Sequence, residues 1–206
     1  MEKEGLLIVL SGPSGVGKGT VCKELLQEME TLKMSLSHTT RAPRQGEIEG
    51  VNYHFISQAE FEANINKEAY LEWAKVFDHY YGTPLAAVEE NRKNGMDTLL
   101  EIDTQGAILV KEKYPEGVFI FLLPPSFEAL KQRLCGRKTE TPEKIAKRLK
   151  EFKNEVNRSP MYDYLVVNDD ITAAKERMKA IISAEHLKFE HSTKYAELLA
   201  EDIDLC

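Results

Sequence analysis

The stretch that decides the fold runs from Leu6 to Thr20 and reads LLIVLSGPSGVGKGT. Its first five residues are apolar and predict a buried strand, and its glycines predict a turn whose backbone N–H groups converge on an anion. A helix must begin near Lys18, so the lysine ammonium and the unpaired N–H groups of the first helical turn add positive charge. This pattern favours a loop that binds the β- and γ-phosphates of a nucleotide over a glycine-rich turn without function.

One position departs from the usual phosphate-loop pattern. That pattern places Ser or Thr directly after the lysine, where the hydroxyl ligates magnesium, but this chain has Gly19 there and Thr20 one residue later. The departure weakens an interpretation as a GTPase or a motor protein. The Gly-Lys-Gly-Thr version resembles that of nucleoside monophosphate kinases, in which phosphates and water hold most of the magnesium.

Composition limits the class of protein. The chain has 206 residues, 42% of them hydrophobic, which is enough for a sizeable core and predicts one domain with inserted lobes. Its net charge of −7 argues against nonspecific binding to nucleic acid or to anionic membranes. The longest apolar runs are too short to span a bilayer and the first residues lack signal-peptide character, so we expect a soluble, cytoplasmic protein. The three cysteines are widely spaced, which predicts neither a disulfide framework nor a zinc site.

Strands and helices alternate along the chain, which predicts a parallel sheet with helices on its faces. Beyond the first strand, core strands are expected at 98–102, 118–123 and 164–167, with helices from about 104, 126 and 172. Two stretches interrupt the alternation. Residues 37–90 predict a small mixed binding lobe. Residues 136–158 predict a charged helix with one apolar stripe, which makes it a candidate lid; the stripe consists of Ile145, Leu149, Phe152 and Val156.

The segment 37–90 contains residues suited to a phosphate and a base. Arg41 and Arg44 flank Pro43, and two guanidinium groups on one stiff loop can bind a phosphate bidentately. Solvated surface arginines are the alternative, which the neighbouring phosphate loop and the acidic chain disfavour. Glu72 can accept the two hydrogens on the N1–H and N2–H₂ edge of guanine, with an exposed strand-face glutamate as the equal alternative. For Trp73 we expect core packing.

Carboxylates and arginines also occur near the other core strands. Glu101 and Asp103 end a predicted parallel strand, where α/β sheets bind ligands and where a carboxylate meets magnesium or its waters. Helix capping by Asp103 is an alternative that is compatible with this role. The second insert is bracketed by Arg133, Arg137 and Arg148, which could close over a transferring phosphoryl group, whereas a basic solvated helix is the alternative.

Seven segments, taken together, resemble the guanylate kinases, in their bacterial form, from about residue 7 to residue 186. They are SGPSGVGK (11–18), SHTTRAPR (37–44), GVNY (50–53), LEWA (71–74), YYGT (80–83), IDTQG (102–106) and VNDD (167–170). The resemblance implies an α/β fold with a P-loop NTPase-like parallel sheet core, a GMP-binding lobe and a lid. In one guanylate-kinase-like domain it implies a core at 1–36, 91–125 and 159–206, the lobe at 37–90 and the lid at 126–158.

The resemblance also implies the site residues by family position. For GMP they are Ser37, Arg41, Arg44, Tyr53, Glu72, Tyr81, Gly82, Thr83 and Asp103. For ATP they are Gly12, Pro13, Ser14, Gly15, Val16, Gly17, Lys18, Gly19, Thr20, Arg133 and Asn168. The groups expected to act on the transferring phosphoryl are Lys18, Arg41, Arg44, Arg137 and Arg148. Mg²⁺ is expected with ATP, near Thr20 and Asp103, directly or through water.

These residues predict the reaction ATP + GMP → ADP + GDP, within purine nucleotide metabolism and GMP recycling. Phosphoryl transfer needs positioning and charge neutralisation, and the chain supplies cations and N–H groups but no activated Ser, Cys or His constellation. Two alternatives stay open: a non-catalytic guanylate-kinase-like binding module, and a kinase for another monophosphate such as AMP or dGMP. The expected partners are ATP and GMP, with no nucleic acid or membrane, and the oligomeric state is left open.

Overall fold

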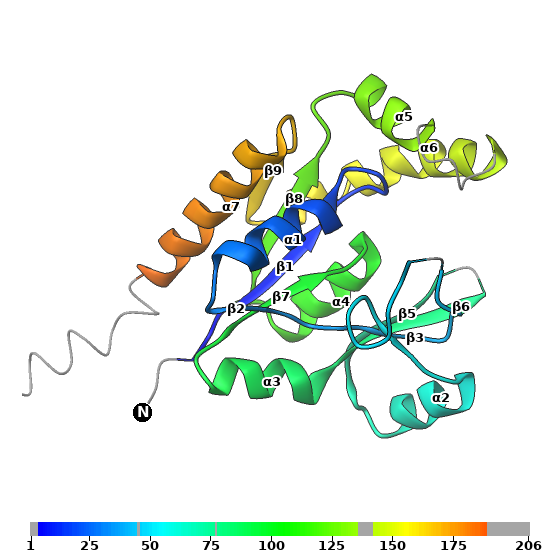
Figure 1. Cartoon of the computed structure of the whole chain (residues 1–206), viewed down its shortest axis with the longest axis vertical. Coiled ribbons are helices and arrows are strands. Elements are labelled where there is room, and N and C mark those ends of the chain that lie inside the picture. The colour runs from blue at the N-terminus through cyan, green and yellow to red at the C-terminus, as the bar shows by residue number, and fades with distance from the viewer. Residues whose placement is uncertain (1–3, 45, 77, 136–141, 189–206) are drawn as a thin grey trace, which may run out of the picture.

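The chain forms an α/β fold; the computed structural model describes residues 4–44, 46–76, 78–135 and 142–188, with 142–147 described by their backbone only. Its main sheet has five parallel strands in the order β2-β7-β1-β8-β9 (Figure 1). The strands are β2 Leu32–Met34, β7 Asp97–Glu101, β1 Leu7–Ser11, β8 Val118–Leu123 and β9 Tyr164–Val167. The predicted parallel sheet is confirmed, and its central strand is the one that leads into the glycine-rich loop.

Helices cover both faces of this sheet because β1 is apolar on both sides. Ile8 and Leu10 pack in a core cluster with residues of α1 and α7, whereas Leu7 and Val9 pack in a second cluster with residues of α3 and α4. The helices are α1 Lys18–Glu28, α7 Ile171–His186, α3 Leu85–Lys93 and α4 Thr104–Lys113. Such continuous apolar strands are typical of parallel sheets that are buried on both faces.

A second, four-stranded sheet lies at one end of the core, in the order β4-β3-β6-β5. Its elements are β3 His38–Thr39, β4 His54–Phe55, α2 Gln58–Asn66, β5 Tyr70–Val76 and β6 His79–Pro84. We call these elements the small lobe. All of them fall inside the predicted segment 37–90. Helix α3 crosses the predicted boundary at residue 90, and its Val88 belongs to the core.

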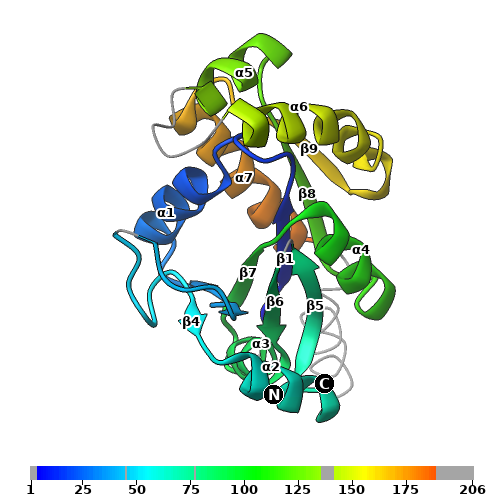
Figure 2. The same cartoon turned by 90° about the vertical axis from the view of Figure 1, so that its right-hand side faces the viewer.

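Two helices lie at the opposite end: α5 Phe127–Cys135 and α6 Pro142–Val156, followed by the 3₁₀ turn η1 Ser159–Met161. The end of β1 that carries the glycine-rich loop lies between these helices and the small lobe (Figure 2). Leu149 and Phe152 of the predicted apolar stripe pack against the core cluster that contains α1. Among the described residues, every helix is too short or too polar to cross a bilayer.

Candidate active site

The loop after β1 is shaped by glycines that no other residue could replace without strain. Gly12 has φ 145°, and a Cβ there would lie 2.3 Å from the carbonyl oxygen of Leu122 on the neighbouring strand. Gly17 has φ 97° and directly precedes α1. The ammonium of Lys18 reaches back over the loop and donates to the carbonyl oxygens of Gly12, at 2.7 Å, and Pro13, at 3.4 Å. The loop therefore closes around a lysine ammonium, as a phosphate-binding loop does.

Three carboxylates counterbalance this ammonium. Burial lowers the pKa of Lys18, and the negative charges of Glu101, Glu155 and Asp103 act in the opposite direction. Glu101 ends β7 and its pKa is raised, because surrounding groups displace water from the carboxylate. A Cβ on Gly19 would lie only 3.4 Å and 3.6 Å from the two Glu101 carboxylate oxygens. These are ordinary van der Waals distances, so the Glu101 carboxylate lies directly beside the glycine that departs from the phosphate-loop pattern.

The structure shows other contacts for Asp103 and Thr20, the two residues predicted for the metal site. Asp103 is the N-cap of α4, and its Oδ1 accepts from the backbone N–H groups of Gln105 at 2.9 Å and Gly106 at 2.8 Å. The capping alternative is therefore present, and it leaves the second carboxylate oxygen of Asp103 available. Thr20 lines a cavity on the side of α7. Within the described residues, no three His, Cys, Asp or Glu side chains are grouped in a way that could hold a metal ion.

Arg133 and Asn168 hold the glycine-rich loop from α5 and from the end of β9. The buried Asn168 side chain donates to the carbonyl oxygen of Val16 at 2.7 Å, and Arg133 donates to the same oxygen at 3.2 Å. Arg133 also donates to the backbone oxygen of Asn168 at 2.9 Å. A cavity of about 240 Å³ lies beside them, and it is lined by Gly15, Gly17, Thr20, Arg133, Asn168 and Ile171. Ile171 was not predicted from the sequence.

The helix α6 contacts the loop at Ser14. Arg148 donates to the Ser14 hydroxyl. Burial raises the pKa of Glu155, on the same helix, and the charge of Lys18 acts in the opposite direction. Just beyond the helix, Arg158 donates to the Thr104 hydroxyl at 2.7 Å. The predicted residue Arg137 lies outside the described residues. Glu155 and Arg158 were not predicted, because no local motif marks them.

In the small lobe, Glu72 is buried where β5 meets α4. Its side chain is only 5% exposed, and the Thr83 hydroxyl donates to its Oε1 at 2.7 Å. A Cβ on Gly106 would lie 2.9 Å from Glu72 Oε2, so only glycine admits the carboxylate this close to α4. The pKa of Glu72 is raised to about 7, chiefly by burial and to a smaller extent by the charge of Asp103, while the hydrogen bond from Thr83 acts in the opposite direction. The exposed-glutamate alternative is wrong.

The neighbouring Trp73 was expected in the core, and this prediction is wrong. Its side chain is 40% exposed. Successive side chains of a strand point to opposite faces, so the inward position of Glu72 turns Trp73 outward. Gly82, on the paired strand β6, is explained by packing. A Cβ there would lie 2.9 Å from the ring of Phe61 and 3.0 Å from the ring of Tyr70.

Arg41 lies in a ring of polar and aromatic groups at the other edge of the small lobe. Its guanidinium donates to both carboxylate oxygens of Glu47, each at 2.9 Å, and to the Tyr81 hydroxyl at 3.1 Å. The ring of Tyr53 lies 5.6 Å from the guanidinium carbon. Burial raises the pKa of Tyr53, and the charge of Glu101 acts in the same direction. Glu47 was missed, although it lies only six residues from Arg41.

Arg44 and Ser37 lie near this cluster in the sequence, and the hydrogen bonds that fix them involve their backbone atoms. The Arg44 backbone N–H donates to Glu47 at 2.7 Å, whereas its guanidinium is exposed to solvent. Ser37 accepts through its backbone oxygen from His54 at 3.0 Å. The exposed arginine and the anchored Arg41 thus differ in how firmly the fold orients them.

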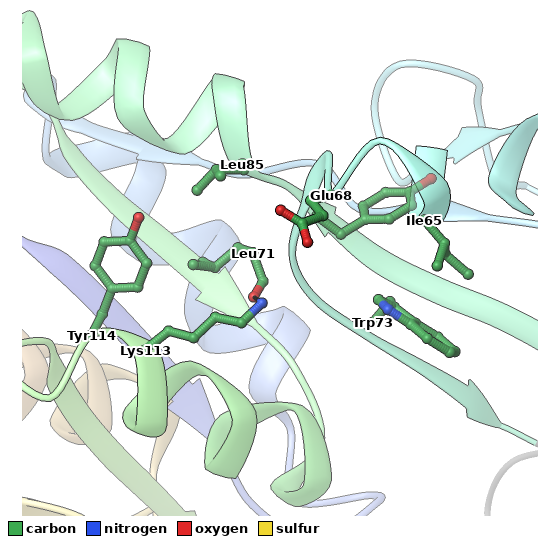
Figure 3. A pocket seen from close by; sticks show the side chains of 8 residues that line it. Ile65, Glu68, Leu71, Trp73, Leu85, Lys113 and Tyr114 are labelled. Carbon is green, nitrogen blue, oxygen red and sulfur yellow. Dashed lines mark hydrogen bonds between the residues drawn. The ribbon is translucent and has the colours of Figure 1, made fainter. Parts of the chain in front are cut away.

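The larger of the two described cavities does not lie at the glycine-rich loop. A larger cavity, of about 360 Å³, lies between the small lobe and the helices α3 and α4 (Figure 3). Lys113 reaches across its floor and donates to the Leu71 carbonyl oxygen at 2.7 Å. The residues lining it are Ile65, Glu68, Tyr70, Leu71, Trp73, Leu85, Lys113 and Tyr114. None of them was predicted for ATP or GMP, and the cavity lies apart from the glycine-rich loop.

Comparisons with known proteins agree with this geometry. The family model described as guanylate kinase matches residues 4–185. The chain is 54% identical to a guanylate kinase of Caldanaerobacter subterraneus subsp. tengcongensis, over 93% of each chain, and 54% identical to one of Halalkalibacterium halodurans, over 97% of this chain and 98% of that protein. The crystal structure of guanylate kinase from Anaplasma phagocytophilum matches with a TM-score of 0.76 and 38% identity, over 91% of this chain and 89% of that one. The chain therefore belongs to the guanylate kinase family.

Proposed function

We propose that this chain is an enzyme that transfers the γ-phosphoryl group of ATP to GMP by direct in-line displacement, giving ADP and GDP. The observation that carries the proposal is a pairing of two sites: a phosphate loop closed around Lys18, and a buried carboxylate, Glu72, in the adjacent small lobe. The first site suits a polyphosphate and the second suits a base with two adjacent donors. We further propose that the enzyme acts in the cytoplasm, in purine nucleotide metabolism and GMP recycling.

Glu72 selects the base. Thr83 already donates to Oε1, so the carboxylate has remaining acceptor capacity for the N1–H and N2–H₂ groups of guanine. Adenine has an acceptor at N1 and no 2-amino group, so AMP would leave a buried charge facing a lone pair. Sites built around buried polar groups reject such analogues by ~10⁴. Ser37 and Thr83 complete the base site in this proposal, and Asp103 lies towards the phosphate and magnesium region.

The acceptor phosphate binds at the cluster around Arg41. Glu47 and Tyr81 hold the Arg41 guanidinium in one orientation, which reduces the entropy lost when a phosphate binds beside it. Tyr53 and the exposed Arg44 supply further donors. Arg44 closes onto the phosphate when GMP binds, because its guanidinium is exposed and free to turn.

ATP binds along the glycine-rich loop. The loop N–H groups and Lys18 take the β- and γ-phosphates, Arg148 adds charge from α6, and adenine enters the cavity beside Arg133 and Asn168. The buried Asn168 Oδ1 has no hydrogen-bond partner among the described residues, and the side-chain amide of Asn168 holds the loop by donating to the Val16 carbonyl oxygen.

Magnesium fits this site as a metal held mainly by ATP phosphates and water. The carboxylates of Glu101 and Asp103 both act on Lys18, and Glu101 stands where Gly19 lacks the usual hydroxyl. We propose that these carboxylates, with Thr20, hold the metal-bound waters. The ion would supply charge neutralisation for the phosphates.

A coupled ADP-release assay tests the function. Purified protein receives ATP and Mg²⁺ with GMP, dGMP, AMP, CMP or UMP in parallel, and without any acceptor. We expect rapid ADP release with GMP and a preference over AMP on the order of 10⁴. Equal rates with AMP would refute the assignment of Glu72, and no release above the acceptor-free control would favour the non-catalytic binding module.

A further inference from the structure

The strand β5 carries an extra residue directly before Glu72. Tyr70 lies opposite Pro84 of β6. Glu72, two residues further on, lies opposite Thr83, so two steps along β5 match one step along β6. Leu71 is therefore the inserted residue of a β-bulge. Bulges bend a strand and change the direction of its side chains, and they are common next to active sites.

The bulge turns two successive side chains towards the same helix. The buried Leu71 belongs to the core cluster that contains Ala107 and Val110 of α4. The Glu72 carboxylate lies against Gly106 of that helix, where a Cβ would be 2.9 Å from its Oε2. In a regular strand successive side chains point to opposite faces, so only one of the two would face α4. The inward direction of Glu72 therefore depends on the bulge.

Lys113 supports this bulge from the last turn of α4. Its ammonium donates to the carbonyl oxygen of Leu71 at 2.7 Å (Figure 3). Because β5 is an edge strand of the small-lobe sheet, a side chain of another element can reach its backbone. Lys113 is also the last residue of α4, where a cation complements the helix dipole. Hydrogen bonds from charged donors are stronger than neutral ones, so Lys113 firmly links the core to the residue before Glu72.

We propose that Lys113 is a positioning residue for base recognition: its hydrogen bond to the bulge carbonyl holds β5 in the bent form that directs Glu72 towards the base. The inference rests on the proposed function, because it concerns how Glu72 meets guanine. Lys113 touches no part of GMP in this scheme and acts only through Leu71 and Glu72. Hydrogen bonds weaken steeply when they are misaligned, so a small displacement of the strand would weaken both bonds from guanine to the carboxylate.

Two other roles for Lys113 predict different results. As a plain link between the small lobe and α4, it would affect the melting temperature or kcat equally for every acceptor base. As a nearby charge, it would act on the ionisation of Glu72. Burial raises the pKa of Glu72 most, Asp103 at the start of α4 also raises it, and Lys113 lowers it. An effect through charge alone would disappear at high pH, where Glu72 is ionised with or without Lys113.

Steady-state kinetics with GMP and AMP, at pH 7 and at a pH well above it, test the proposal. Lys113→Met keeps the side-chain stem and removes the donor, whereas Lys113→Arg keeps both charge and donors. Lys67→Met is the matched control, because Lys67 is exposed at the end of α2. For Lys113→Met we expect the KM of GMP to rise about tenfold at both pH values, with kcat and the Kd of ATP changed by less than about threefold.

The other readouts follow from the same reasoning. AMP makes no use of the Glu72 carboxylate, so the GMP-to-AMP preference in kcat/KM should narrow by about tenfold in Lys113→Met. Lys113→Arg should recover most of the loss, and Lys67→Met should match the unsubstituted protein. In the Glu72→Gln background, Lys113→Met should raise the KM of GMP by less than about twofold, because the carboxylate that Lys113 positions is gone.

Four outcomes would overturn the proposal: an unchanged KM of GMP in Lys113→Met, a loss that vanishes at high pH, an equal loss with AMP, or losses that multiply in the double variant. If Lys113→Met melts below the assay temperature, Lys113→Gln takes its place, since glutamine is uncharged and one atom shorter than lysine. Failure of the proposed function is distinguishable, because the unsubstituted protein would then show no preference for GMP over AMP, and the inference would fail with it.

Discussion

Replacing Glu72 with Gln should make the protein more stable and less active. The pKa of this carboxyl is 4.5 when exposed and about 7 when buried in the small lobe. Above pH 7 the folded protein must hold an ionised group in a place that favours the neutral form. At ~1.4 kcal/mol per pKa unit, this costs about 3 kcal/mol of folding free energy. The amide carries no charge, so most of that cost disappears in the variant.

The sign of the pH dependence follows from the raised pKa. Between pH 4.5 and about 7 the folded chain binds a proton at Glu72 that the unfolded chain has released, so stability falls as the pH rises through this window. Above pH 7 the loss is complete and levels off. In Glu72→Gln this part of the pH dependence should vanish, and the gain in unfolding free energy over the unsubstituted protein should therefore be largest above pH 7.

Activity should change in the opposite direction. Each hydrogen bond from guanine to an ionised carboxylate contributes ~1.5–3 kcal/mol, so two of them account for ~3–6 kcal/mol. Since every 1.4 kcal/mol is tenfold in rate, kcat/KM for GMP should fall by about 10² to 10⁴. AMP makes neither bond, so the GMP-to-AMP preference should narrow by loss of GMP activity.

Denaturant unfolding at pH 5.5 and pH 8, together with ADP-release kinetics at pH 8, would measure both effects. Glu68→Gln is the control, since Glu68 is exposed and undergoes the same chemical change four residues away. It should alter neither quantity. The reasoning is refuted if Glu72→Gln keeps the nucleotide preference, or if its stability at pH 8 is lower than that of the unsubstituted protein.

The remaining predictions concern the phosphate sites. Lys18→Ala should lower kcat by ~10² or more with little loss of melting temperature, and retention of more than about a tenth of the rate would contradict its role. Arg41→Ala and Arg44→Ala should weaken GMP binding in calorimetric titrations and leave ATP nearly unchanged, with poor rescue by Lys; the reverse pattern would mean that the two phosphate sites are interchanged. Small-angle scattering should show a smaller radius of gyration with GMP and a non-hydrolysable ATP analogue than without them, and an unchanged radius would argue against closure of the small lobe and α6.

Much of the core could be predicted because its signals are local. The run at 118–123 coincides with β8, the run at 164–167 coincides with β9, and the other two predicted core strands differ from β1 and β7 by one residue. The short β2 was missed, since Leu32–Met34 has only three residues and is completed by its pairing with β7. Trp73 was wrongly expected in the core. Its neighbour Glu72 takes the buried face of the strand, so Trp73 points to the opposite, exposed face.

The site residues also fall into those that local sequence motifs identified and those that only the fold brought together. Residues of contiguous motifs, such as the glycine-rich loop and Arg41 with Arg44, could be chosen from the sequence. Glu155 and Ile171 could not, because each becomes significant only through a residue more than 130 positions away in the chain: the charge of Lys18 for Glu155 and the cavity shared with Gly15 for Ile171. No motif spans such a distance.

The sequence by itself determined the chemistry of this protein: a lysine in a glycine-rich turn, arginines on a stiff loop, and a carboxylate within an apolar segment. These depend on residue type and on neighbours a few positions away. Only the tertiary structure decided how the carboxylates differ. Burial raises the pKa of Glu72 against the hydrogen bond from Thr83, the carboxylate of Glu101 lies beside Gly19, and the fold brings Glu155 of α6 within the influence of the Lys18 charge. Charge and hydrogen-bond energies depend on distance and on solvent exclusion, and both arise only when distant segments pack.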